Sequence, residues 1–319
     1  MSTFFVILNM VKDMTRTEKL LYILIVLVVS FIIFLFYQNF DKINKNINEF
    51  ITSVKEPKIN IPNDKIIYNR KYSYKTVHDT DNFSPKNIED LKSIYYTVLN
   101  NGWDEFTFYC DKEYENCAND VKTIADDSEY INLINNYVSP YNSYKKYNTV
   151  ITNNNAITLT IEKLYSNDEI TNINAKLDNI FYELEINNTI SNTNIKKLHD
   201  YLINNIKYDE DYKENNRESI SNKAYGALFN GLALCSGYTD TLALMLDKLN
   251  IPNFKVTSEK HVWNVIYYDG KWTHIDSTWD DDEVNKYNQH NFYMISTDDL
   301  FKKDKEEHNF DVSDYLELN

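Results

Sequence analysis

The sequence contains little glycine, proline and cysteine, and fewer basic than acidic residues. Its 319 residues include five glycines, five prolines and three cysteines. No spacing of cysteines and histidines resembles a zinc site, so we expect no metal and no cofactor. The 33 basic residues against 48 acidic ones give a net charge of −15, which argues against a nucleic-acid partner because nucleic-acid-binding surfaces need positive charge.

One long apolar run stands near the N-terminus, from Leu20 to Tyr37, and it contains no charged residue. This length fits a membrane-spanning helix, and no small-residue cleavage signal follows it. We therefore predict an uncleaved single-pass N-terminal anchor, with a cleaved secretion signal as the alternative. The basic residues on the two sides are nearly balanced, but a short tail before a long domain favours an extracytoplasmic domain.

The remaining chain is divided by composition and apolar periodicity. We expect a tail (1–19), the membrane anchor (20–37), a linker (38–65), a small α/β subdomain (66–165) and a C-terminal domain (166–319). The sequence assigns no function to residues 66–165, where Ser84-Pro85 predicts a helix start. Cys110 and Cys117 form a disulfide if the domain lies outside the cytoplasm, and two free thiols if it lies inside.

The scarce glycines are concentrated in one segment. Four of the five, and three of the four tryptophans, lie between Tyr225 and Asp282. Glycine supplies backbone freedom where the chain is tightly constrained, so the geometry of this segment is closely specified. Apolar residues at helical spacing follow Cys235, which predicts a helix that begins there, has Ser236 as its candidate cap and ends before Pro252. The positive end of the helix dipole favours the thiolate form of a cysteine at that position.

A hairpin follows this helix. Asp269-Gly270 predicts a two-residue turn between a strand from His261 to Tyr268 and a strand from Lys271 to Thr278. In this register Tyr268 faces Lys271, and His261 faces Thr278. Side chains alternate along strands, so one face of the hairpin carries His261, Trp263, Trp272, His274 and Asp276. His261 and Asp276 are diagonal neighbours within contact distance, but spacing alone does not bring Cys235 to His261.

Three short motifs resemble those of the transglutaminase-like superfamily, in particular its bacterial single-domain members. They are Gly-Leu-Ala-Leu-Cys-Ser-Gly-Tyr, His-Val-Trp-Asn-Val and His-Ile-Asp-Ser-Thr-Trp-Asp-Asp. The resemblance is strongest from about Asn194 to Trp279, and Val262 departs from the alanine of many relatives. It implies an α+β fold with a papain-like transglutaminase core, in which a helix bearing the cysteine packs on an antiparallel sheet bearing the histidine and the aspartate. It also implies a triad: Cys235 as nucleophile, His261 as general base and acid, and Asp276 as the residue that orients His261.

Other side chains have weaker signals. Trp263 and Trp279 flank the triad positions and belong either to the walls of an active cleft or to the core. By resemblance alone, Tyr208 and Tyr225 are candidates for lining an oxyanion site. A structural or packing role is expected for His199 and His274, and a solvated acidic loop for Asp280, Asp281 and Asp282, whereas His78, His290 and His308 carry no signal in the sequence.

The activity implied by the triad is that of a membrane-anchored thiol enzyme. Cys235 attacks the carbonyl of a peptide or glutamine amide and forms a thioester, with the N–H of Cys235 stabilising the oxyanion. Water then completes a peptidase or amidase reaction, and an amine completes a transglutaminase reaction. The expected partners are a protein or peptide substrate and the membrane; the oligomeric state is not predicted. The alternative is a catalytically inactive envelope adaptor or binding module with the same fold.

Overall fold

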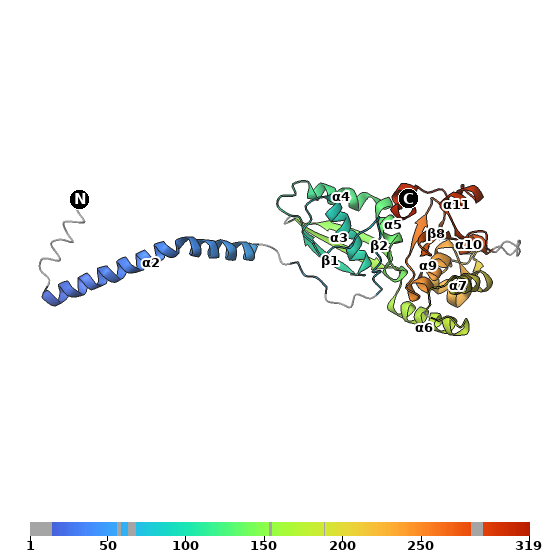
Figure 1. Ribbon diagram of the computed structural model, residues 1–319, viewed down its shortest axis with the longest axis horizontal. Coiled ribbons are helices and arrows are strands. Elements are labelled where there is room, and N and C mark those ends of the chain that lie inside the picture. The colour runs from blue at the N-terminus through green and yellow to red at the C-terminus, as the bar shows by residue number, and fades with distance from the viewer. Residues whose placement is uncertain (1–14, 56–58, 63–67, 153–154, 188, 282–289) are drawn as a thin grey trace. The chain divides into compact units, whose positions relative to one another are not determined.

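The computed structural model describes residues 15–55, 59–62, 68–152, 155–187, 189–281 and 290–319 (Figure 1). The chain divides into two compact units, residues 1–58 and residues 59–319, which we describe separately. Most of the predicted tail, parts of the predicted linker, the first two residues of the predicted subdomain and Asp282 lie outside the described residues.

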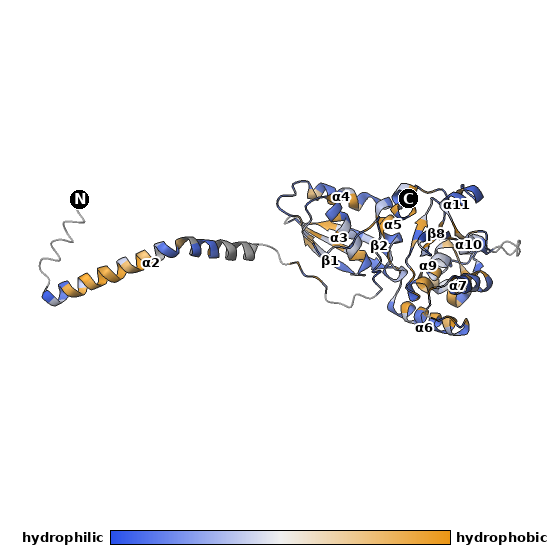
Figure 2. Cartoon of the chain, in the orientation of Figure 1, coloured by the Kyte–Doolittle hydropathy of each residue, from blue (hydrophilic) through white to orange (hydrophobic). Residues whose placement is uncertain are grey.

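The described part of the first unit is a single helix, α2 (Arg16–Lys55). Thr15 begins it, since its N–H donates to the Glu18 carboxylate over 2.7 Å. Residues Arg16–Phe40 are long and apolar enough to cross a membrane, and Figure 2 shows hydrophobic residues concentrated in this part of the helix. A signal sequence meets the same criteria. The helix continues to Lys55 through much of the segment predicted as a linker.

The second unit begins with a three-stranded antiparallel sheet of order β1-β3-β2. Its helices and strands are α3 (Ile88–Asn100), β1 (Glu105–Tyr109), α4 (Cys117–Asp126), α5 (Ser128–Asn136), β2 (Tyr144–Ile151) and β3 (Ala156–Lys163). The Asn87 side chain accepts from the N–H of Asp90 and caps α3, so the helix start predicted at Ser84-Pro85 is wrong. Cys110 and Cys117 form a disulfide that joins the end of β1 to the first residue of α4.

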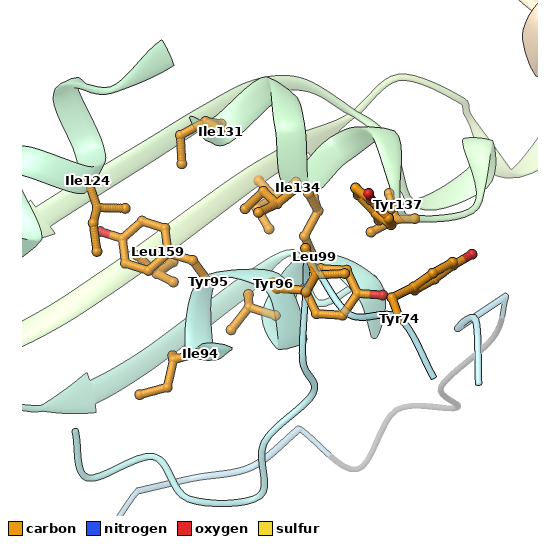
Figure 3. Close-up of a cluster of buried hydrophobic side chains, with 14 of the residues drawn as sticks. Tyr74, Ile94, Tyr95, Tyr96, Leu99, Ile124, Ile131, Ile134, Tyr137 and Leu159 are labelled. Atoms are coloured by element: carbon orange, nitrogen blue, oxygen red, sulfur yellow. The ribbon is translucent and has the colours of Figure 1, made fainter. Parts of the chain in front are cut away.

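Tyrosine and aliphatic side chains fill the core of this region. Figure 3 shows Ile94, Tyr95 and Leu99 of α3 together with Ile134 of α5 and Leu159 of β3. The same hydrophobic cluster includes side chains from the second sheet, among them Phe254, Val256, Trp263 and Val265. Residues 66–165 and 166–319 thus share buried apolar surface, and the division between them at residue 165 stays a prediction.

A second, four-stranded antiparallel sheet of order β6-β7-β8-β9 follows, with helices around it. The elements of this region are α6 (Asn167–Glu183), α7 (Asn192–Asn205), β4 (Lys207–Tyr208), α8 (Glu218–Ser221), β5 (Leu232–Ala233), α9 (Cys235–Lys248), β6 (Asn253–Thr257), β7 (Val262–Tyr268), β8 (Lys271–Ile275), α10 (Ser277–Asp280), β9 (Tyr293–Ile295) and α11 (Thr297–Lys303). Single turns lie at Pro140–Asn142, Gly226–Asn230, Val312–Asp314 and Leu316–Leu318.

Helix α9 begins at Cys235, as the apolar pattern predicts, and packs against β6 and β7. Leu242, Met245 and Leu246 are fully buried because they lie on its apolar face. The cap prediction is wrong: Leu234 holds the N-cap position without a side-chain hydrogen bond. The Ser236 hydroxyl instead donates to Asn222 Oδ1 over 2.7 Å, which ties the start of α9 to the preceding segment.

The hairpin of β7 and β8 has the predicted turn and register. Asp269 and Gly270 both have positive φ, at 51° and 78°, and Tyr268 pairs with Lys271. The second strand is shorter than predicted and ends at Ile275, because the Asp276 carboxylate accepts from the N–H groups of Thr278 (2.9 Å) and Trp279 (3.2 Å) and begins α10. The predicted pairing of His261 with Thr278 is therefore wrong, since Thr278 lies in that helix.

The turn at Leu316–Leu318 is hydrogen-bonded to residues that lie much earlier in the second unit. The Glu317 carboxylate accepts from the N–H of Lys75 over 2.5 Å, from the Thr76 hydroxyl over 2.7 Å and from the Tyr137 hydroxyl over 2.7 Å. Glu317 is buried, and these donors replace the water that an exposed carboxylate would bind. The final described residues are therefore part of the core packing around Tyr74 and Tyr137.

Candidate active site

A buried histidine and aspartate form the centre of the site. His261 stands directly before β7 and Asp276 directly after β8, and His261 Nε2 lies 2.5 Å from Asp276 Oδ2. Burial alone would lower the pKa of His261. The charge and hydrogen bond of Asp276, together with the side chain of Cys235, outweigh burial and raise this pKa to about 10. Burial raises the pKa of Asp276, but its imidazole neighbours His261 and His308 bring it well below the usual value.

The third predicted residue, Cys235, meets this pair. Its side chain lies close enough to the His261 imidazole to contribute to the raised pKa of that ring. Because His261 Nε2 is bonded to Asp276, Nδ1 is the nitrogen left for the sulfur. Thr239 holds Cys235 close to the strand that follows His261. Its hydroxyl lies 2.8 Å from the carbonyl oxygen of Cys235 and 2.9 Å from that of Val262. The start of α9 is thereby tied to the start of β7, a long-range contact that sequence spacing does not reveal.

Cys235 is half-buried and is the first residue of α9. The first N–H groups of a helix have no partner within the helix. The backbone N–H of Cys235 is therefore suited to bind an oxyanion that develops beside its own sulfur, a geometry that favours acyl transfer.

The two candidate tryptophans occupy different places. Trp263 is fully buried, and its ring stacks on that of His261 with centroids 5.6 Å apart. Its Nε1–H donates to His274 Nδ1 over 2.9 Å. Trp279 is 38% exposed, and its ring centroid lies 6.3 Å from that of His261. Trp263 thus lies in the core beneath the imidazole, and Trp279 reaches the surface beside it.

The two candidate tyrosines also differ. Tyr208 is 40% exposed on β4, which pairs in parallel with β5 just ahead of Cys235. Burial, with a contribution from Cys235, raises the pKa of Tyr208 to about 12. Tyr225 stacks on Phe229 with ring centroids 4.6 Å apart, and Phe229 is exposed. The sequence analysis did not single out Phe229, although it lies six residues before Cys235.

His308 is a member of the site that the sequence did not reveal. Its Nε2 lies 2.9 Å from Asp276 Oδ2, and its Nδ1 lies 2.9 Å from Asp304 Oδ2. The side chain is completely buried. The sequence carries no signal for this placement of His308. Its 32-residue separation from Asp276 gives no periodic signal, because an irregular segment after α11 brings it back to the site.

A second group of histidines and aspartates consists of His199 and Asp200 on α7, Asp280 on α10, and His290 before β9. Buried His199 Nε2 lies 3.1 Å from Asp280 Oδ2, and exposed His290 Nε2 lies 2.6 Å from Asp200 Oδ1. Asp280 is fully buried and accepts from the N–H of Phe292, so its prediction as a solvated residue is wrong. His199, Asp200 and His290 are close enough to share a metal ion, as are His261, Asp276 and His308, but both sets are already joined by hydrogen bonds.

Residues 184–277 match the family model of the transglutaminase-like superfamily. This confirms the resemblance found in the sequence. The transglutaminase-like segment runs from the end of α6 through Asp276 and includes Cys235 and His261. His308 and Asp304 lie beyond it, so the part of the site that the sequence missed is also outside the matched transglutaminase-like region.

Two solved structures are similar to parts of the chain. One is described as a TGase, with 16% identity and a TM-score of 0.34 over 46% of this chain and 47% of its own. The other is a candidate cysteine protease from Cytophaga hutchinsonii, with 13% identity and a TM-score of 0.26 over 42% of this chain and 61% of its own. The chain thus spans about half to three fifths of the length of these proteins. No curated protein matches it.

Proposed function

We propose that this protein is a thiol enzyme that forms an acyl-enzyme on Cys235 from a peptide or glutamine amide. It then hydrolyses the acyl group, as a peptidase or amidase, or transfers it to an amine, as a transglutaminase. The observation that supports this most directly is the buried His261 imidazole, which contacts both the Cys235 side chain and the Asp276 carboxylate. The three residue types are those of a nucleophile, a base and an orienting group.

In this proposal the side chains move one proton through two steps. The Cys235 thiolate attacks the carbonyl carbon and forms a C–S bond, while the negative charge on oxygen is held by the N–H of Cys235. The C–N bond then breaks as His261 gives its proton to the departing amine or ammonia. Water or an amine loses a proton to His261 and attacks the thioester, the C–S bond breaks, and the proton returns to the Cys235–His261 pair. Asp276 holds the imidazole with Nδ1 toward the sulfur throughout.

The fold proposed for this chemistry is the papain-like arrangement, in which the cysteine-bearing helix lies on the sheet that carries the histidine and the aspartate. Its support is the packing of α9 on β6 and β7 and the hydroxyl contact of Thr239 to both elements. We assign Trp279 and Tyr208 to the substrate-facing surface because both rings are partly exposed beside the triad. We assign Trp263 to support of the imidazole because it is buried against it.

The second candidate is a catalytically inactive envelope adaptor or binding module. The match to a transglutaminase-like model does not separate the two, because a fold does not fix an activity. What favours the enzyme is that all three chemical groups are present and in contact. An adaptor has no requirement for a thiol at a helix start beside a buried imidazole.

The membrane location is part of the proposal. Residues Arg16–Phe40 support a single-pass anchor by length and composition, and the Cys110–Cys117 disulfide supports an oxidising, extracytoplasmic location for the second unit. The substrate would then be a protein or peptide on the outer side of that membrane, and no nucleic acid is proposed as a partner, given the net charge of −15.

One assay tests the activity and distinguishes its forms. The full chain in detergent is incubated with a glutamine peptide and a fluorescent primary amine, and ammonia, peptide fragments and labelled peptide are measured together. Ammonia with labelled peptide indicates transfer, ammonia alone indicates amidase activity, and fragments indicate peptidase activity. Cys235→Ala is the control for each product. If a panel of peptides gives no product and iodoacetamide does not label Cys235 in the folded protein, the adaptor replaces the enzyme.

A further inference from the structure

His308 lies between two carboxylates, an arrangement that His199 shares at longer distances, with Asp200 at 3.5 Å and Asp280 at 3.1 Å. The two ring nitrogens of His308 face Asp276 at 2.9 Å and Asp304 at 2.9 Å. A neutral imidazole carries one N–H and one bare nitrogen, whereas an ionised carboxylate only accepts hydrogen bonds. With both carboxylates ionised, the two contacts are hydrogen bonds only if both nitrogens carry a proton, so the geometry points to an imidazolium.

The aromatic neighbours of His308 also suit a cation. Its ring lies 4.7 Å from that of Trp263, 5.4 Å from that of Trp279, and stacks on Phe292 with centroids 5.3 Å apart. The negative faces of aromatic rings attract a cation, most strongly where water is excluded. The side chain is fully buried, so these rings and two carboxylates replace water as its environment.

His274 provides the contrast within the same core. Its Nδ1 accepts from the indole N–H of Trp263 over 2.9 Å, so that nitrogen carries no proton, and Nε2 faces the Thr297 hydroxyl at 3.1 Å. Burial and the charge of His308 lower the pKa of His274 to about 3. Two buried histidines of one site thus have different hydrogen-bond partners: carboxylates for His308, and an indole and a hydroxyl for His274.

We propose that His308 is a positioning residue that stays protonated and holds the Asp276 carboxylate between two imidazoles. The charged and titratable groups that face it are Asp276, Asp304 and, at 5.3 Å between ring centroids, His261, with neutral His274 behind Trp263. The resulting chain of alternating charge runs from Cys235 through His261, Asp276 and His308 to Asp304. Its role in catalysis depends on the function proposed above, whereas its charge state does not.

For the reaction, this means that Asp276 stabilises the protonated form of His261 less strongly than it would without His308. Asp276 Oδ2 accepts from both imidazoles, so its negative charge is shared. An imidazolium about 5 Å away disfavours a second proton on His261. Sharing therefore makes His261 a better proton donor to the leaving amine, while the hydrogen bonds still fix the carboxylate.

The charge of His308 can be measured without any substrate. The full chain in detergent micelles is labelled with ¹⁵N on its six histidines, and the ring nitrogens are followed from about pH 5 to about pH 9. The His308 signals, assigned by their loss in His308→Gln, are expected to show two protonated nitrogens throughout, and His274 one. A neutral His308 ring at about pH 7 overturns the proposal.

Two variants test the effect on His261, whose ring is followed to about pH 12 because its pKa is about 10. Asp304→Asn removes the outer carboxylate without touching Asp276, and His308→Gln removes the cation. In both, the titration midpoint of His261 is expected to rise by about one pH unit or more, because His308→Gln removes the positive charge and Asp304→Asn removes a carboxylate that stabilises it. Asp304→Asn is the decisive variant if His308→Gln does not fold. His78→Gln is the matched control, since His78 is exposed, and should leave the midpoint unchanged.

The outcomes separate this proposal from the proposed function. An unchanged His261 midpoint in Asp304→Asn, with the fold intact, means that His308 has only a packing role and overturns the proposal. A charged His308 and a shifted His261 together with a Cys235 that iodoacetamide does not label leave this proposal standing and remove the enzyme. In the expected case, iodoacetamide still labels Cys235 in both variants at about pH 7, but the turnover of the acyl-transfer reaction falls. The reason is that His261 binds its proton more strongly and gives it to the leaving amine more slowly.

Discussion

The His261 imidazolium should control how Cys235 reacts at acid and neutral pH. Raising the pKa of His261 from 6.5 to about 10 favours its charged form by about 5 kcal/mol, at about 1.4 kcal/mol for each pH unit. The imidazolium therefore stays charged beside the sulfur at about pH 6, and the proposed function has it pair with the Cys235 thiolate. An ordinary thiol, with a pKa of about 8.5, is only about 0.3% thiolate at that pH.

The perturbation is His261→Ala, and the assay is the rate of iodoacetamide labelling between about pH 5 and pH 10. We expect labelling of Cys235 at about pH 6 to fall by on the order of 100-fold in the variant, because no imidazolium pairs with the thiolate. Above about pH 9 the two rates should converge, since a thiolate then forms without a partner. His78→Ala, at an exposed site, should follow the wild-type profile.

The sign of the effect on stability follows from the same pKa. The pKa of His261 is raised on folding, so the charged imidazole contributes its full stabilisation below about pH 6.5 and loses it as pH rises through about 10. The melting temperature of the wild type should decline across that window more steeply than that of His261→Ala. Identical labelling profiles for the wild type and His261→Ala would refute the reasoning, because the pair would then not control the thiol.

Three further results are expected. Cys235→Ala should abolish acyl transfer and leave the melting temperature nearly unchanged, since the lost sulfur lies in a half-buried position; circular dichroism and product formation measure both. Removing the disulfide with Cys110→Ser and Cys117→Ser should lower the free energy of unfolding by about 2–3 kcal/mol in a denaturant titration, because the bond closes a loop of seven residues' separation. The full chain should sediment with membranes, whereas a chain that begins at Ile59 should be soluble and folded; full-length protein in the soluble fraction, with an intact N-terminus, refutes the anchor.

The parts of the site that the sequence revealed depend on local chemistry. The Asp269-Gly270 turn sets the strand register by itself, because both residues adopt positive φ in a two-residue loop. The register then brings Asp276 beside the start of β7, and the helical pattern after Cys235 sets the start of α9. The end of β8 was missed because Asp276 caps α10, and a capping role competes with strand extension only through its own side-chain hydrogen bonds.

The parts that the sequence did not reveal depend on contacts between distant segments. His308 has no repeating pattern around it, and only the return of the chain after α11 brings it to Asp276. The burial of Asp280 likewise depends on His199, which is 81 residues away along the chain. Polar residues in an acidic run look solvated unless their partner is known, and neither partner is adjacent in sequence.

The hydrogen bonds between Glu317 and much earlier residues affect the order in which contacts form during synthesis. Its carboxylate binds the hydroxyl of Tyr137, which is made 180 residues earlier. At about 5–20 residues per second, the tyrosine waits roughly 10–40 seconds for this partner. His308, which completes the surroundings of Asp276, is also made late. The thiol of Cys235 is therefore present on the growing chain before His261, Asp276 and His308, the groups that define its site.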